Sequence, residues 1–182
     1  MKIDSHQHYW HFNTADYGWM GENMSVIKHD FLPIDLLPEL KSIDFDGSVA
    51  VQARQSLEET CWLLQLADEH PHIKGVVGWL DLRSEQVEEQ IAAFAKHPKA
   101  VGVRHVIHDE EDVDFMLRPE FIRGVKLLEK YNLAYDILIF PTHLTNAIQF
   151  VKQFSEKQTF VVDHIAKPFK KRALLDSLAR YL

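Results

Sequence analysis

The chain has few of the features that mark secreted, fibrous or membrane proteins. It contains one cysteine, Cys61, in 182 residues, so no disulfide can form within the chain, and a reducing compartment is expected. Only 7 glycines and 7 prolines occur, which excludes collagen-like and low-complexity chains. The longest apolar stretches, such as residues 134–140, are far shorter than the ~18 residues of a membrane helix. Because the first residues also lack a signal-like apolar segment, a cytoplasmic protein is expected.

Positive charge is also scarce, while histidine is abundant. There are 20 Lys and Arg residues against 27 Asp and Glu residues, a formal net charge of −7. Nucleic-acid binding depends on clustered cations, so no nucleic-acid partner is expected. The 46% hydrophobic and 26% charged residues are typical of a globular domain that buries a core. The 11 histidines indicate metal or acid–base chemistry on a small molecule.

Short β-branched runs alternate with amphipathic segments along the chain. Strands are predicted at residues 2–8, 47–54, 74–80, 100–105, 134–139 and 159–164. Helices are predicted at residues 57–69, 84–95, 120–131, 144–154 and 172–182, with one more opening at Pro33. This alternation predicts an α/β fold with a parallel sheet and right-handed crossovers. We expect one domain over residues 1–182 with six βα units, whereas a complete (β/α)8 barrel has ~250 residues.

Ionisable and polar side chains follow five of the six predicted strands. In parallel α/β folds, functional groups collect at the carboxyl ends of the strands. The residues concerned are His6 and His8, Gln52 and Arg54, Asp81, Arg104 and His105, and Asp163 and His164. Their convergence predicts a functional site at one edge of the sheet. Trp10 follows the first strand and either covers this site or packs the barrel mouth.

The two histidines of the first strand are the first candidates for chemistry. Strand residues two apart point to the same face, with Cα atoms ~6.6–7 Å apart. His6 and His8 therefore converge, together with Asp4, where a metal ion or a substrate carbonyl could bind. His164 ends the sixth strand and is the third candidate. The alternative is that these histidines are structural and bind nearby backbone groups.

Other residues carry two interpretations each. Arg104 either clamps a substrate or forms a structural ion pair, and because His105 is its neighbour, only one of them can point inward; we favour Arg104. Cys61 is predicted to be a buried thiol rather than a nucleophile. His108 is predicted to be solvated, as is the basic run that begins at Lys167 and continues through residues 170–172.

Four segments give the chain a family resemblance. The opening IDSHQHYW (residues 3–10) resembles the start of amidohydrolase-related barrel hydrolases. Three more segments are similar to the sugar-lactonase-like branch, which includes L-fuconolactonase-like, L-rhamnonolactonase-like and pyrone-dicarboxylate-lactonase-like enzymes. They are VQA with EET (51–53 and 58–60), GVRH (102–105) and VDHIAKP (162–168).

The resemblance implies a (β/α)8 TIM barrel that hydrolyses an aldonolactone-like cyclic ester in carbohydrate metabolism. His6, His8 and His164 would be the catalytic residues and the ligands of one divalent metal ion, zinc or manganese, which some members do without. Arg104 would contact the substrate, and Gln52, Arg54 and Trp10 are further candidate substrate contacts at the same edge. The family's water-activating carboxylate lies in a Gly-Ser-Asp-Trp-Pro-like segment of the last strand. This sequence has no such segment, and the last two βα units are expected to be missing.

Two alternatives remain open from the sequence. The same residues suit a metal-dependent amidohydrolase or decarboxylase of the wider family. A truncated chain could also be a non-catalytic binding or assembly module, because open sheet edges favour pairing into a homo-oligomer. For the enzyme hypotheses, the expected partner is a small molecule, a sugar lactone or a related cyclic ester, with no membrane and no nucleic acid.

Overall fold

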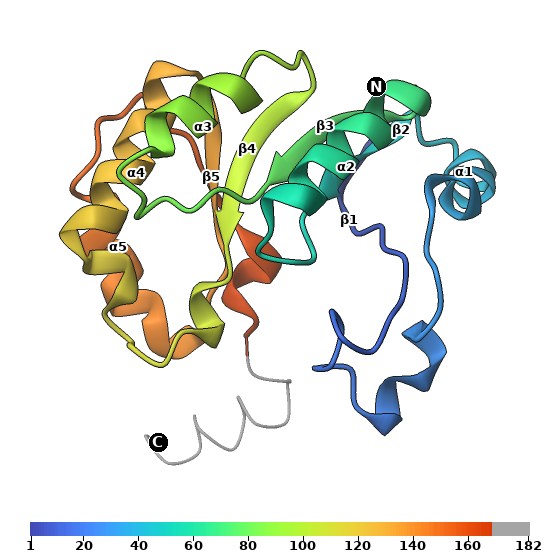
Figure 1. Ribbon diagram of the computed structural model, residues 1–182, viewed down its shortest axis with the longest axis horizontal. Coiled ribbons are helices and arrows are strands. Elements are labelled where there is room, and N and C mark those ends of the chain that lie inside the picture. The colour runs from blue at the N-terminus through green and yellow to red at the C-terminus, as the bar shows by residue number, and fades with distance from the viewer. Residues whose placement is uncertain (169–182) are drawn as a thin grey trace, which may run out of the picture.

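A single parallel sheet of six strands organises the chain. The computed structural model describes residues 1–168. The strands are β1 (Ile3–Gln7), β2 (Gly47–Val51), β3 (Ile73–Gly78), β4 (Ala100–His105), β5 (Ala134–Ile137) and β6 (Phe160–Val162). They lie side by side in the order in which they occur in the chain, and every neighbouring pair is parallel (Figure 1). The six predicted strands are therefore confirmed; β3 begins one residue earlier than predicted, and β6 covers three of the six predicted residues.

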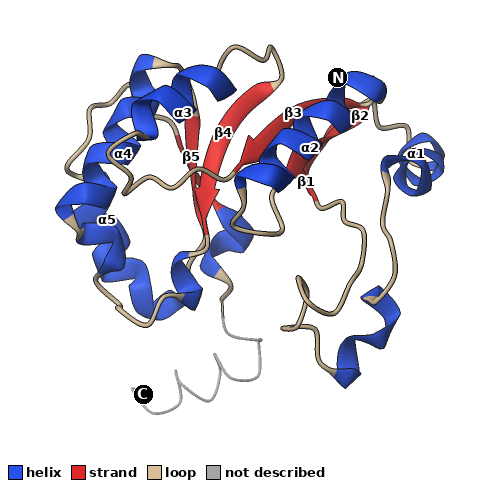
Figure 2. Cartoon of the chain, in the orientation of Figure 1, coloured by secondary structure: helices blue, strands red, loops and turns tan. Residues whose placement is uncertain are grey.

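Helices follow the strands and cover the outer side of the curled sheet (Figure 2). They are α1 (Pro33–Ser42), α2 (Leu57–Glu69), α3 (Val87–Phe94), α4 (Pro119–Lys130) and α5 (Leu144–Val151). The helix predicted at 172–182 lies outside the described residues, as do residues 170–172 of the basic run. Strand–helix alternation around a curled parallel sheet is the arrangement of an incomplete (β/α)8 barrel, as predicted.

Local sequence explains where the helices begin. α1 and α4 both start with a proline, whose missing N–H would be unpaired in the first turn in any case. α2 starts after Ser56, whose side chain accepts a hydrogen bond from the backbone N–H of Glu59. These starts place the loops between strand and helix at the carboxyl edge of the sheet, where the candidate site lies.

The core lies between the sheet and the helices. Leu63 of α2, Ile91 of α3 and Phe121 of α4 are fully buried, and each contributes ~1.5–3 kcal/mol by leaving water. Gly124 allows α4 to approach the chain after β3, because a Cβ at this position would lie 1.9 Å from the Leu82 carbonyl oxygen. The sheet is thus held by close packing on its helical side, which makes it a rigid base for the site.

Two findings concern the surface of the fold. Cys61 is exposed on α2, which corrects the prediction of a buried thiol. The reason is the helical period, since Leu63 and Ala67 form the buried face of α2 and Cys61 lies outside that face.

Within residues 1–168, none of the helices combines the length and the apolar character that crossing a bilayer would require.

Candidate functional site

Three histidines meet at the carboxyl edge of the sheet. His6 and His8 lie at the end of β1, and His164 lies in a 3-10 turn (Asp163–Ala166) directly after β6. The ring of His6 is 4.8 Å from the ring of His8 and 4.6 Å from the ring of His164. The structure therefore brings together the three histidines that the sequence singles out. Asp4 does not join them, because its carboxylate accepts hydrogen bonds from the His6 backbone and from Gln7.

The hydrogen bonds of His8 fix where its proton lies. Its Nδ1 is 2.8 Å from the carbonyl oxygen of Val51, which can only accept, so Nδ1 carries the proton and Nε2 keeps a lone pair. The Nε2 atoms of His6 and His8 are 3.1 Å apart, and Arg104 Nη1, which can only donate, lies 3.2 Å from the same His6 nitrogen. Burial, together with the charge of Arg104, lowers the pKa of His8 to about 3. His8 is therefore neutral, and the lone pair of its Nε2 faces His6.

A buried ion pair forms the floor under these histidines. Arg104 Nη1 donates to Asp163 Oδ2 at 2.9 Å, and both residues are only 3% exposed. Arg104 also donates to the backbone and side-chain oxygens of Gln52, and its Nη1 lies 3.2 Å from His6 Nε2. The other carboxylate oxygen of Asp163 lies 3.6 Å from His6 Nδ1. Although burial opposes ionisation, the nearby His6 and the hydrogen bond from Arg104 leave the pKa of Asp163 below its ordinary value.

Arg104 and its neighbour point to opposite sides of β4, as strand alternation predicts. His105 packs on the helical side, where its ring stacks on Phe115 at 4.8 Å. Its Nε2 lies 2.6 Å from a carboxylate oxygen of Glu110. His105 therefore belongs to the core, and Arg104 is the residue that faces the site.

The candidate substrate contacts occupy three different surroundings. Gln52 is fully buried beside Arg104, in the floor of the site. Arg54 forms an ion pair with Asp16 at 3.0 Å, and Trp10 donates its indole N–H to the carbonyl oxygen of His29 at 2.8 Å. No hydrogen bond or ion pair within the described part of the chain joins Arg54 or Trp10 to the three histidines. Both residues instead fasten the long loop that follows β1.

Asp136 is a buried acid that the sequence reasoning missed. It lies on β5 directly opposite Arg104 of β4 in the sheet register and is 4% exposed. Burial, together with the negative charge of Asp163, raises its pKa to about 7. One feature of the sequence points to it. Asp136 interrupts the otherwise apolar run 134–140, and an aspartate in a buried strand is rare unless it has a partner or a function.

Glu59 is a second buried acid, and it shapes the loop after β2. Its Oε2 accepts the backbone N–H groups of Ala53 at 3.0 Å and Arg54 at 2.8 Å. Desolvation raises the pKa of Glu59 to about 7 in spite of these hydrogen bonds. In the sequence, Glu59 stands out only as part of the EET segment of the family resemblance. A carboxylate in the first turn of a helix is common, so its position alone does not indicate a buried acid.

The site has some of the donors that a divalent metal would need. The 3.1 Å between the Nε2 atoms of His6 and His8 suits two ligands placed ~2.0–2.1 Å from one zinc ion. However, the Arg104 guanidinium already brings a positive charge to this point. Within residues 1–168, no group of three or more His, Cys, Asp or Glu side chains is arranged to hold a metal ion. The described residues therefore provide a pair of imidazoles and do not fit the expected three-histidine ligand set.

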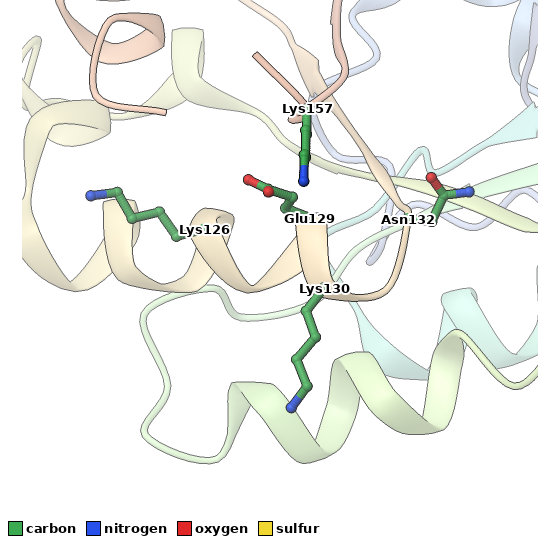
Figure 3. Close-up of a pocket in the computed structure, with 5 residues that line it drawn as sticks. All are labelled: Lys126, Glu129, Lys130, Asn132 and Lys157. Atoms are coloured by element: carbon green, nitrogen blue, oxygen red, sulfur yellow. The ribbon is translucent and has the colours of Figure 1, made fainter. Parts of the chain in front are cut away.

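A pocket on the opposite edge of the sheet is separate from this site. It is lined by residues of α4 and of the segments that precede β5 and β6 (Figure 3). These residues are Lys126, Glu129, Lys130, Asn132 and Lys157. They lie at the amino ends of the strands, where barrel folds carry residues for stability rather than for catalysis.

Comparison with known proteins shows which family the chain belongs to. The sequence profile described as Amidohydrolase (Amidohydro_2) matches residues 3–181. The chain belongs to the amidohydrolase family. Relatives of this amidohydrolase chain include an L-fucono-1,5-lactonase of Burkholderia multivorans, 40% identical over 92% of this chain and 56% of the relative. An L-fucono-1,5-lactonase of Burkholderia ambifaria is 34% identical over 92% of this chain and 57% of the relative.

Solved structures agree with the fold of this amidohydrolase chain. A crystal structure of an amidohydrolase from Burkholderia multivorans with bound zinc has a TM-score of 0.85 and 39% identity. The match covers 90% of this chain and 57% of that one. The chain thus spans a little over half the length of the relatives it matches.

Proposed function

We propose that the site hydrolyses a lactone, with a six-membered sugar lactone such as an L-fucono-1,5-lactone as the substrate class. The names of the two Burkholderia relatives support this choice. The observation that carries it is the arrangement of half-buried and exposed imidazoles over a buried Arg104–Asp163 pair. Ester hydrolysis needs a group that polarises the carbonyl and a base that activates water, and this arrangement offers both.

His6 is the group that polarises the carbonyl. In the tautomer with a proton on Nε2, which lies 3.1 Å from His8 Nε2, this N–H is available to a carbonyl oxygen. Arg104 lies behind it, with Nη1 3.2 Å from His6 Nε2, so a positive charge faces the point where the oxyanion develops. Arg104 is buried, so its N–H groups are shielded from water, while Asp163 offsets part of its charge.

His164 is the base that accepts a proton from the attacking water. Its ring lies 4.6 Å from that of His6, and the residue is exposed at the mouth of the site. Desolvation and the nearby charge of His6 lower the pKa of His164, so the neutral, proton-accepting form dominates at neutral pH. Gln52 and Asp163 take no part in the reaction itself and hold Arg104 in place.

The proposal is tested with the purified 182-residue chain and L-fucono-1,5-lactone, with other aldonolactones for comparison. Proton release, followed with a pH indicator, reports hydrolysis above the spontaneous rate. We expect acceleration by the chain, its loss in His6→Asn and a strong reduction in His164→Ala. His11→Asn is the matched control, because His11 pairs with Asp30 on the loop surface.

Two results would separate the proposal from its alternatives. A rate that the His164→Ala change leaves untouched makes the site assignment wrong. No acceleration of any lactone overturns the proposed function and favours the assembly module, whose exposed apolar residues would include Val161, Val162 and Ile165. Hydrolysis that requires stoichiometric zinc or manganese would favour the metal-dependent amidohydrolase or decarboxylase.

A further inference from the structure

Lys167 and His108 form a cluster beside the site that the sequence does not reveal. Both were predicted to be solvated, and this is wrong, because both side chains are partly buried against each other. Lys167 Nζ lies 2.7 Å from His108 Nε2. The ring of Phe140 stacks on the ring of His108 at 4.5 Å, and Lys167 Nζ lies 5.2 Å from the centre of the same aromatic ring.

The hydrogen bonds of this cluster give each group one role. His108 Nδ1 lies 2.6 Å from a carboxylate oxygen of Asp109, which can only accept, so Nδ1 carries the proton of His108. His108 Nε2 then has a lone pair that accepts an N–H of the Lys167 ammonium. The arrangement holds Lys167 as a directed proton donor, and within residues 1–168 its other two N–H bonds have no hydrogen-bond partner.

The backbone places Lys167 close to His164. Lys167 directly follows the 3-10 turn that carries His164, and its backbone N–H donates to the His164 carbonyl oxygen at 2.9 Å. His164 and Lys167 both have positive φ, 49° and 47°, so the chain folds sharply back at the carboxyl end of β6.

Opening a lactone ring requires a proton on the ring oxygen. When the tetrahedral intermediate collapses, the ring C–O bond breaks and leaves an alkoxide, a strong base and therefore a poor leaving group. His6 donates its N–H to the carbonyl oxygen, His8 only accepts, and His164 takes a proton from water. A donor on the side of the ring oxygen supplies this proton directly, without its return from His164.

We propose that Lys167 is the general acid that protonates the leaving ring oxygen, and that His108 and Asp109 position it; this inference rests on the proposed lactone hydrolysis. As the carbonyl-carbon-to-oxygen bond breaks, its electron pair goes to the ring oxygen, which takes a proton from Lys167 Nζ. The products are the hydroxy acid and a neutral amine. The amine recovers a proton from the acid product or from the proton that the attacking water released, so the charges balance.

The test compares Lys167→Ala and Lys167→Arg with the unmodified chain on the same lactone. Arginine keeps the positive charge but does not release its proton near neutral pH. We expect kcat to fall roughly 10²–10⁴-fold in both variants, the range of general acid–base catalysis, while KM changes little. A primary alkylammonium ion added to Lys167→Ala should restore part of kcat in proportion to its concentration. Lys126→Ala is the control, because Lys126 lies at the opposite edge of the sheet.

The outcomes distinguish this inference from the proposed function. Suppose that the unmodified chain opens the lactone and that Lys167→Arg has the same kcat. Lys167 then contributes its positive charge and not a proton, and the inference is overturned. Unchanged kcat in Lys167→Ala overturns it as well. If the unmodified chain opens no lactone, the proposed function itself fails. Thermal unfolding of each variant checks that the fold is kept, and alkylammonium rescue separates a missing proton donor from a damaged structure.

Discussion

Arg104 Nη1 and Asp163 Oδ2 are 2.9 Å apart, and this ion pair joins the end of β4 to the end of β6. The two residues are separated by 59 positions in the chain, and both are almost completely buried. A buried ion pair adds little net stability, because desolvation offsets its attraction, but losing one partner leaves an uncompensated charge. The pair therefore fixes the positions of His6 and Gln52 more than it stabilises the fold.

Replacing Arg104 with methionine should destabilise the chain strongly. The substitution leaves Asp163 buried without its partner, and breaking such pairs costs about 3–5 kcal/mol. The midpoint of urea unfolding, with an unchanged slope, measures this loss. The double variant Arg104→Met, Asp163→Asn should recover much of it, because no unpaired charge remains. Equal stability of the single and double variants would contradict the interpretation.

Much of the fold could be predicted because its signals are local. Six short β-branched runs separated by amphipathic segments specify parallel βα units, since such strands need helical crossovers. The grouping of His6, His8 and His164 followed from one rule, that parallel strands place their carboxyl ends at one edge. The bounds of α2, at Leu57–Glu69, agree with the prediction because Ser56 is a clear helix cap.

The rest of the site depends on contacts between distant segments. Arg54 was grouped with the site by its strand end, yet Asp16 of the first loop pairs with it. Lys167 was assigned to a solvated run, yet its partner His108 is 59 positions away. Asp136 lies opposite Arg104 only through the register of β4 and β5. Sequence spacing carries no information on such pairings.

Asp136 should make the chain less stable as pH rises toward neutrality. Its pKa is about 7 in the folded chain and lies near 3.8 without burial, so the folded state binds one more proton between these values. The free energy of unfolding should therefore fall by about 1.4 kcal/mol per pH unit in this range for this group. The stability that comes from proton binding by folded Asp136 is fully present below pH 3.8 and is lost as the pH rises through 7.

The substitution Asp136→Asn isolates this effect. Asparagine cannot ionise, so the variant should gain stability over the unmodified chain at pH 8 and lose that advantage toward pH 5. Thermal or urea unfolding across this pH range measures the difference. Asp44→Asn is the matched control, because the Asp44 side chain is 92% exposed and should leave the slope unchanged. Parallel slopes for Asp136→Asn and the unmodified chain would contradict the prediction.

Chelation of divalent metal should leave lactone hydrolysis nearly unchanged. The Arg104 guanidinium lies 3.2 Å from His6 Nε2, so it would repel a second cation at this nitrogen and already supplies positive charge there. After dialysis against a chelator, kcat should change by no more than roughly twofold. Metal content is measured on the same sample. Loss of activity that zinc or manganese restores would instead show that the imidazole pair recruits a metal.

The acid limb of the pH–rate profile should report His164. A general base must be unprotonated, so kcat/KM should fall as pH drops through the pKa of His164. Because desolvation lowers this pKa below 6.5, the limb should lie below that pH. His164→Gln keeps a polar side chain but cannot titrate, so the rate should be low and the limb should disappear. His8 cannot produce this limb, since its pKa is about 3. An unchanged limb in His164→Gln would assign the base to another residue.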